Sequence, residues 1–284
     1  MAKGNLFLGT AARSVGDVVM YRREGAQVSR VRVRKIANPK TNAQSIQRNF
    51  FSPVAKFFAP LAITLAESFE GLSKSKSYSK FLKINIKKAR SNGWYLPKGT
   101  GFFPLPYQVS EGTLPTMGYA YDANSSALTA TIGTAATAVT TIGGLSAGFI
   151  AKGYAAGDIV TIIVAVRDAN DNYFPLASQF VIDTDSADTI ASSFGSITVA
   201  VSGESNNELS ATSALGTVVG GAIIVARYEN EKWRRSTQSF VVDADILVDV
   251  TDADNRATAI ASYGNAANGA NPLVYLDGPE TVFQ

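Results

Sequence analysis

The sequence predicts an α+β protein in which a β-hairpin and two helices precede an antiparallel β-sandwich of immunoglobulin-like type. Three observations lead to this prediction: apolar residues at helical spacing before residue 93, a proline-rich stretch after them, and short strand-like segments beyond it. The predicted organisation is residues 1–100 as a basic hairpin and helical module, 101–116 as a linker, 117–250 as the sandwich, and 251–284 as a C-terminal helix and tail.

The N-terminal region contains a predicted hairpin that turns at Arg23-Glu24-Gly25. Because strand side chains alternate, the arginines of the return strand share one face, while Val31 and Val33 share the other. We therefore expect the valine face to be buried and the arginine face to meet anions or a partner. The candidate binding residues are Arg22, Arg23, Arg30, Arg32, Arg34 and Lys35.

Two helices are predicted after this hairpin. Thr41 is placed to cap the first, in which apolar residues recur every three or four positions from Ile46 to Phe69. Pro53 and Pro60 interrupt that pattern, so we expect a kink or two consecutive helices. The second helix spans residues 77–93 and carries a cationic side, for which an ordinary solvated face is the simplest explanation. The cations of this side are Lys76, Lys80, Lys83, Lys87, Lys88 and Arg90.

The segments SVGDVVMYRREGAQVSRVRVRK and NPKTNAQSIQRNF carry a family resemblance. They resemble the start of an uncharacterised family from Bacteroidetes genomes and their bacteriophages, with an Asn-Pro-x-Thr-x-x-Gln-x-x-x-Arg signature. Here the signature falls on Asn38, Pro39, Thr41, Gln44 and Arg48. Because similar signatures recur in phage head and tail proteins, the resemblance implies a virion component and makes Gln44 and Arg48 interface candidates. It covers about the first quarter of the chain and implies no catalytic residue.

The chain contains neither cysteine nor histidine. This composition excludes Cys/His zinc sites, cysteine nucleophiles and Ser-His-Asp triads. Residues 144–148 (GLSAG) match a nucleophile-elbow pattern but lack the histidine base, so we expect Ser146 to cap a short helix instead. We interpret the Asp-rich segments near residues 183 and 252 as turns. The alternative interpretation is a calcium site. We predict no enzyme activity, no cofactor and no metal.

Charge is divided unequally along the chain. Residues 1–100 hold 19 Lys/Arg and 4 Asp/Glu, a net charge of +15, whereas residues 101–284 hold 7 and 19, a net charge of −12. Such asymmetry indicates a basic end that faces nucleic acid, a membrane surface or an acidic partner. The alternative is that the basic half meets the acidic half of another copy. The uncharged run between Asp122 and Lys152 is rich in Ala, Thr, Ser and Gly, so we predict no membrane segment.

The C-terminal half is predicted to be rich in β-strands. Its predicted strands are Met117–Asp122, Ala127–Ile132, Asp158–Arg167, Tyr173–Ile182, Gly195–Ser202, Thr217–Tyr228 and Lys232–Val242. Residues 162–183 align without gaps with residues 222–243, which favours two similar hairpins in one sandwich. An aromatic and basic cluster is formed by Trp233, Arg234 and Arg235. We interpret it as a contact patch in preference to a stacking platform.

The sequence therefore predicts a structural component of a bacteriophage virion, associated with the head or tail and acting by protein–protein assembly. Its expected partners are other virion proteins and copies of itself, and its expected location is the virion after synthesis in the bacterial host cytoplasm. The alternative is a nucleic-acid-binding or DNA-organising protein that uses the basic N-terminal hairpin. The same arginines also suit carboxylate bridges to another subunit or protection of an edge strand.

Overall fold

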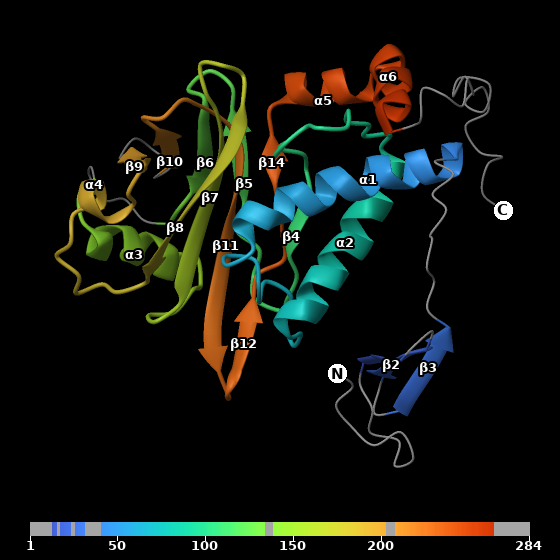
Figure 1. The fold of residues 1–284 in the computed structure, drawn as a ribbon. Coiled ribbons are helices and arrows are strands. Elements are labelled where there is room, and N and C mark those ends of the chain that lie inside the picture. The colour runs from blue at the N-terminus through green and yellow to red at the C-terminus, as the bar shows by residue number, and fades with distance from the viewer. Residues whose placement is uncertain are drawn as a thin grey trace. The chain divides into compact units, whose positions relative to one another are not determined.

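The structure is a computed structural model that describes residues 13–15, 18–23, 26–31, 41–133, 139–202 and 208–263. Its contacts divide the chain into two compact units, Met1–Lys40 and Thr41–Gln284 (Figure 1). The division falls directly before the first helix, whereas the prolines and glycines predict a linker at residues 101–116. The two predicted helices therefore belong to the same unit as the sheets.

The N-terminal unit is a three-stranded antiparallel sheet. Strands β1 (Arg13–Val15), β2 (Val18–Arg23) and β3 (Ala26–Val31) lie in the order β1-β2-β3, and Arg23 pairs with Ala26. The predicted hairpin is thus present as β2 and β3. The expectation that Val31 is buried is wrong, because this residue ends an edge strand and is exposed.

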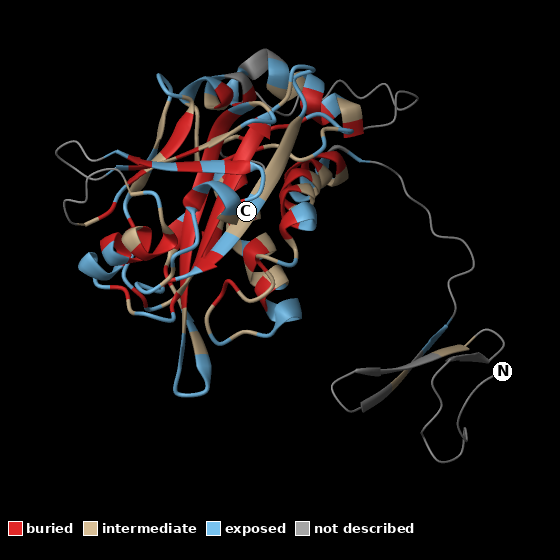
Figure 2. Ribbon diagram, turned by 90° about the vertical axis from the view of Figure 1, so that its left-hand side faces the viewer, coloured by how far each residue is buried: buried red, intermediate tan, exposed pale blue. Residues whose placement is uncertain are grey.

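The second unit is built on a central antiparallel sheet. It contains β12 (Lys232–Arg235), β11 (Thr217–Glu229), β7 (Ile159–Arg167) and β8 (Tyr173–Val181) in that order, with β14 (Val241–Val242) paired to β11. Strands β7 and β11 are almost continuously apolar because both faces of this sheet are buried, as the red strands of Figure 2 show. The aligned segments of the sequence are the β7–β8 and β11–β12 hairpins of this one sheet, as predicted.

One face of the central sheet packs against a second sheet. This sheet has the order β5 (Tyr119–Asp122), β6 (Ala127–Thr131), β10 (Glu208–Ser213) and β9 (Ile197–Ser202). Leu128 and Leu209 of the second sheet share one hydrophobic cluster with Ile162 and Val164 of β7. Helices α3 (Ile142–Ala151) and α4 (Ile190–Ser193) add Phe149 and other side chains to the same cluster.

The other face of the central sheet is covered by helices. They are α1 (Asn42–Phe58), the 3-10 turn η2 (Ala59–Leu61), α2 (Lys74–Ser91), α5 (Ala244–Thr251) and α6 (Ala253–Tyr263). Phe57 and Phe81 from these helices share a cluster with Ile163 and Ile224 of the sheet. A short ribbon of β4 (Gln108–Ser110) and β13 (Gln238–Ser239) adjoins it. The α+β class is therefore confirmed.

Local signals at the helix ends match the structure in part. The Thr41 side chain caps α1 by accepting a hydrogen bond from the Gln44 amide, and Gly93 follows α2 with a φ of 66°. Helix α1 continues through Pro53, and Pro60 lies in η2 directly after the helix. The expected role of Ser146 is wrong, because Thr141 caps α3 while Ser146 lies inside the helix and accepts a hydrogen bond from the Asp183 amide.

The strand predictions for the second unit fail at three places, the first of which is β4, because it lies within the predicted linker 101–116. Strand β10 is absent from them because its sequence ELSATS contains one strongly apolar residue, Leu209. The predicted strand Lys232–Val242 is broken, because buried Ser236 pairs with Val225 through its backbone amide and its hydroxyl, and β13 then joins β4. The predicted C-terminal helix corresponds to α6, and the tail after residue 263 lies outside the described residues.

Candidate functional site

The β11–β12 hairpin forms the lowest part of the second unit in Figure 1. Its two-residue turn has φ values of 52° at Asn230 and 59° at Glu231, the left-handed conformation that a tight hairpin turn requires at both central positions. The turn fixes the register, so that Tyr228 lies opposite Trp233 and Ala226 opposite Arg235. Side chains of the two strands therefore divide into an aromatic face and a charged face.

The aromatic face is exposed at the end of the hairpin. The rings of Tyr228 and Trp233 have centroids 5.2 Å apart, and the Arg235 guanidinium lies 4.7 Å from the centroid of the Trp233 ring. Tyr228 is 60% exposed, which is unusual for a large ring within a sheet. This face thus consists of one exposed ring, one partly buried ring and a cation stacked on the second ring.

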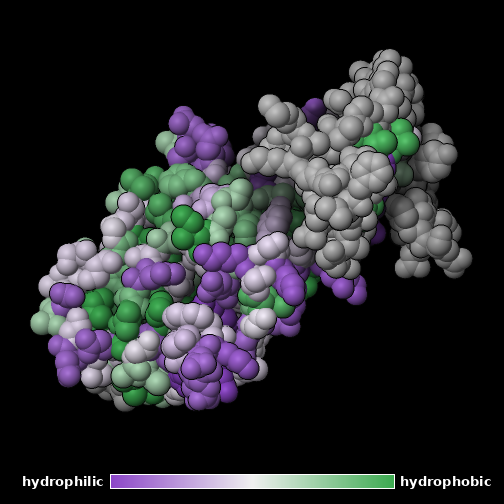
Figure 3. Space-filling view, turned by 60° about the horizontal axis from the view of Figure 1, so that its bottom comes forward, coloured by the Kyte–Doolittle hydropathy of each residue, from purple (hydrophilic) through white to green (hydrophobic). Residues whose placement is uncertain are grey.

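A small cavity extends this aromatic face. It has a volume of about 250 Å³ and lies between residues 63–68 and the helix-covered face of the central sheet, where Trp233 and Arg235 line it. Ile63 also lines the cavity and is 96% exposed. Figure 3 views the molecule from below and shows hydrophobic residues interspersed with hydrophilic ones over this end. We call Ile63, Tyr228, Trp233 and Arg235 the hairpin surface.

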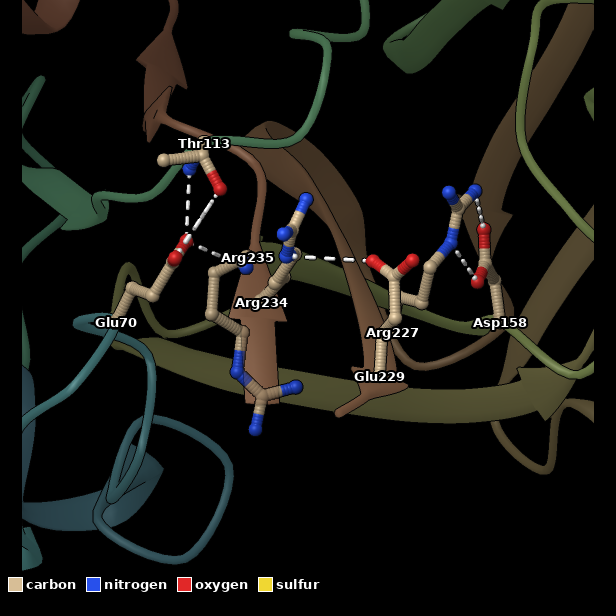
Figure 4. A network of polar contacts seen from close by, with 7 residues as sticks. All are labelled: Glu70, Thr113, Asp158, Arg227, Glu229, Arg234 and Arg235. Atoms are coloured by element: carbon tan, nitrogen blue, oxygen red, sulfur yellow. Dashed lines mark hydrogen bonds and ion pairs between the residues drawn. The ribbon is translucent and has the colours of Figure 1, made fainter. Parts of the chain in front are cut away.

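A partly buried ion pair holds the base of the hairpin (Figure 4). Arg227 donates from Nε and Nη2 to the two carboxylate oxygens of Asp158, and both distances are 2.7 Å. The Asp158 side chain is only 1% exposed, and it also accepts a hydrogen bond from the Ala155 amide. These hydrogen bonds to Asp158 raise the pKa of Arg227 above its ordinary value. The hairpin is therefore held at its base by a two-point contact.

A second polar contact fixes β12 from the helical side (Figure 4). The Glu70 carboxylate accepts hydrogen bonds from the Thr113 amide at 2.8 Å and from the Arg235 amide at 3.3 Å. Partial burial acts to raise the pKa of Glu70, but these hydrogen bonds outweigh it and the pKa lies below its ordinary value. The Arg235 Nε donates to the Glu67 carbonyl oxygen at 3.0 Å. Arg235 is thus held over Trp233 in one orientation.

The charged face of the hairpin has a different character. Arg234 lies opposite Arg227, and its Nε is 3.3 Å from the Glu229 carboxylate. Both side chains are 44% exposed, so this ion pair contributes little to stability. The sequence cluster Trp233-Arg234-Arg235 is therefore split, with Trp233 and Arg235 on the hairpin surface and Arg234 behind it.

The other predicted site residues lie elsewhere. Arg22, Arg23 and Arg30 belong to β2 and β3 of the N-terminal unit, where Arg30 is exposed. Arg32, Arg34 and Lys35 lie outside the described residues, so their predicted common face stays a prediction. Gln44 and Arg48 are one turn apart on α1, both partly buried. The structure brings neither of them to the hairpin surface.

A larger cavity of about 620 Å³ lies along β5 and β6, and its ionisable lining residues are Tyr119, Lys152, Tyr154 and Glu208. Burial, with a smaller contribution from the charge of Asp158, raises the pKa of Tyr154 to about 12. The Tyr154 hydroxyl donates to the Pro115 carbonyl oxygen. A neutral tyrosine held in this way acts as a structural hydrogen-bond donor.

Within the described residues, no helix combines the length and apolar character needed to cross a membrane. No three acidic side chains among these residues gather as a metal site would require. Comparisons with protein-family models, with curated proteins and with solved structures find no match.

Proposed function

We propose that this chain is a structural component of a bacteriophage virion, associated with the head or tail, that acts by protein–protein assembly. The observation that carries the proposal is the hairpin surface, on which exposed Tyr228 lies beside partly buried Trp233 and Arg235 on a fixed scaffold. Tryptophan, tyrosine and arginine are the residues that most often dominate the free energy of protein association. The proposed partners are other virion proteins and further copies of this chain.

The scaffold supports this role because it is preorganised. Asp158 holds the base of the hairpin through Arg227, and Glu70 holds β12 from the helical side. A surface that is already ordered loses little conformational entropy when a partner binds, so more of its contact energy appears as affinity. The proposed location is the virion, after synthesis in the bacterial host cytoplasm.

An immunoglobulin-like type for the two facing sheets belongs to the same proposal. It is supported by the two antiparallel sheets, whose inward side chains form one shared hydrophobic cluster. The helical layer on the outer face of the central sheet adds to such a sandwich.

The test is quantitative mass spectrometry of purified particles, combined with sedimentation of the isolated chain. We expect the chain at stoichiometric levels in virions, and we expect Tyr228→Ser with Trp233→Ser to abolish its association with itself or with other virion proteins. A matched control is Tyr173→Ser, which changes a partly buried aromatic on β8. Absence of the chain from purified particles would overturn the proposal.

The alternative function is nucleic-acid binding through the N-terminal unit. It is supported by the charge of residues 1–40, which hold nine Lys/Arg and two Asp/Glu, and by exposed Arg30 on β3. The triple variant Arg30→Ala, Arg32→Ala and Arg34→Ala tests it. We expect a loss of salt-dependent affinity for duplex DNA if this unit binds phosphates, and unchanged affinity would exclude the role.

A further inference from the structure

Helix α2 carries a row of cations along its exposed side. Lys76, Lys80, Lys83, Lys87 and Arg90 follow one another at intervals of four, three, four and three residues, so they share one face of the helix. At 1.5 Å per residue the row is about 21 Å long. The opposite face is buried through Ser77, Phe81, Asn85 and Ala89. We call these five cations the α2 stripe.

Three of the four lysines of the α2 stripe form no ion pair within the described part of the chain. Lys80 forms an ion pair with Glu111 at 2.9 Å, and the Arg90 guanidinium lies 5.7 Å from the centroid of the Phe50 ring. Among the described residues, no carboxylate lies within ion-pair distance of Lys76, Lys83 or Lys87, and all three are exposed. Helix α2 itself contains no Asp or Glu.

The N-terminal part of this row opposes the stability of the helix, whereas Arg90 in the last turn is favoured by the helix dipole. Lys74 and Lys76 lie in the first turn, where the helix dipole disfavours positive charge. The pairs Lys76 with Lys80 and Lys83 with Lys87 are four residues apart, a spacing at which like charges repel. A ligand that neutralises the row would therefore stabilise the helix as well as bind to it.

We propose that the α2 stripe binds the phosphate backbone of a nucleic acid. This goes beyond the assembly role of the hairpin surface, because it assigns a polyanion site to a different element. Regularly spaced negative charge along a polymer complements a straight row of cations, and lysine ammonium groups bind phosphates without reading the base sequence. Binding is expected to be independent of sequence and steeply dependent on salt.

Several aspartates among the described residues serve to close turns. Asp122 accepts hydrogen bonds from Asn124 and Ser125, Asp168 accepts them from Asn170 and Asn172, and other aspartates close their own turns in the same way. These carboxylates are distributed over separate loops as turn residues. The observations therefore favour a phosphate backbone over an acidic neighbour as the ligand of the stripe.

The experiment measures the affinity of the full chain for a fluorescent duplex DNA of random sequence over a range of salt concentrations. The test variant is Lys76→Ala with Lys83→Ala and Lys87→Ala. The control is Lys98→Ala with Lys152→Ala and Lys232→Ala, which removes the same charge from three exposed lysines elsewhere. Circular dichroism verifies that both variants are folded.

We expect the slope of log affinity against log salt to become shallower by about 2 to 3 in the test variant and by less than about 1 in the control. Duplex DNA should also raise the melting temperature of the wild-type chain more than that of the test variant. Equal losses in the two variants would show that only net charge matters and would overturn the proposal, as would a wild-type chain that ignores DNA at low salt.

Two further outcomes also contradict the proposal. An unchanged slope in the test variant, with a loss in the arginine variant of the N-terminal unit, would assign the phosphate contacts to that unit. Loss of self-association with DNA affinity intact would make a second copy the ligand. Neither result bears on the presence of the chain in purified particles, so this proposal and the proposed function fail separately.

Discussion

The two faces of the central sheet differ in chemistry and in how completely they are covered. The face toward the second sheet is mainly aliphatic, with Val160, Ile162 and Val164 packed on Leu128 and Leu209. On the other face, Ile163 and Ile224 of the sheet pack against the rings of the helical layer, and this face continues beyond the helices to Tyr228 and Trp233 on the hairpin. The same sheet face therefore serves as core at one end and as exposed surface at the other.

This difference shows what the helices contribute. Where α1 and α2 cover the sheet, aromatic side chains stabilise the fold by burial. Where the sheet extends past residues 63–68, the rings of Tyr228 and Trp233 lack this cover. Glu70 holds β12 at the transition between the two regions, and Asp158 holds Arg227 on the opposite, charged face of the hairpin.

The largest expected effect comes from the covered region. Phe57 contacts four rings, those of Phe81, Phe102, Tyr107 and Phe240, with centroid distances of 4.8 to 6.1 Å. We expect Phe57→Ala to lower the free energy of unfolding by about 3 to 5 kcal/mol, measured by chemical denaturation. Phe51→Ala, on the same helix but 49% exposed, is the control and should change it by about 0.5 kcal/mol or less. Equal changes in the free energy of unfolding for Phe57→Ala and Phe51→Ala would contradict the presence of an aromatic core under α1.

The next effect tests the anchor of the hairpin. Asp158→Ala leaves the Arg227 guanidinium without its two-point acceptor, so we expect a loss of about 2 to 3 kcal/mol in the free energy of unfolding. The control is Asp171→Ala, because Asp171 forms an exposed pair with Arg167 at 3.9 Å. That change should cost about 0.5 kcal/mol or less. A similar loss of unfolding free energy in both variants would contradict the claim that the Asp158–Arg227 pair stabilises the fold more than an exposed ion pair does.

A third prediction concerns whether removal of a tyrosine hydroxyl raises or lowers the free energy of unfolding. The fully buried Tyr107 hydroxyl has no hydrogen-bond partner among the described residues, and burial raises the pKa of Tyr107. We expect Tyr107→Phe to increase the free energy of unfolding by about 1 kcal/mol. Tyr119→Phe should lower it by about 1 kcal/mol, because the Tyr119 hydroxyl donates to the Ser239 carbonyl oxygen at 2.7 Å. Thermal unfolding of both variants measures the contrast, and a destabilised Tyr107→Phe chain would show that the hydroxyl is satisfied.

The smallest effect is a pH dependence at Glu70. Because its folded pKa lies below the ordinary value of 4.5, the carboxylate stabilises the fold above that pH, and this stability is lost as the pH falls through the folded pKa. Glu70→Gln should therefore lose less stability than the wild type between about pH 6 and pH 3. Glu231→Gln at the exposed hairpin tip is the control. Identical pH profiles for Glu70→Gln and the wild type would contradict a role for this carboxylate.

Much of the fold follows from local sequence. Periodic apolar residues define α1 and α2, and Thr41 and Gly93 mark their ends. The strong β-forming runs of β7 and β11 are equally clear. The sequence does not reveal that the two helices cover the free face of this sheet, because an apolar helix face fits many partners and the choice depends on contacts between residues more than 100 positions apart.

The candidate site follows from the sequence only in part. Trp233 and Arg235 stand out by composition, and a two-residue turn at Asn230 and Glu231 is enough to place Tyr228 opposite Trp233. Ile63 and Glu70 carry no such signal, because they meet the hairpin through the tertiary fold. The buried partner of Arg227 is likewise 69 residues away in the chain.

The most direct test of the central claim is cross-linking mass spectrometry of purified phage particles with a lysine-reactive reagent. Lys232 is exposed and adjoins Trp233, so it reports on what lies against the hairpin surface. We predict that the chain is present at stoichiometric levels and that Lys232 is cross-linked to another virion protein or another copy of the chain. Absence of the chain, or Lys232 cross-links confined to its own chain, would contradict assembly through this surface.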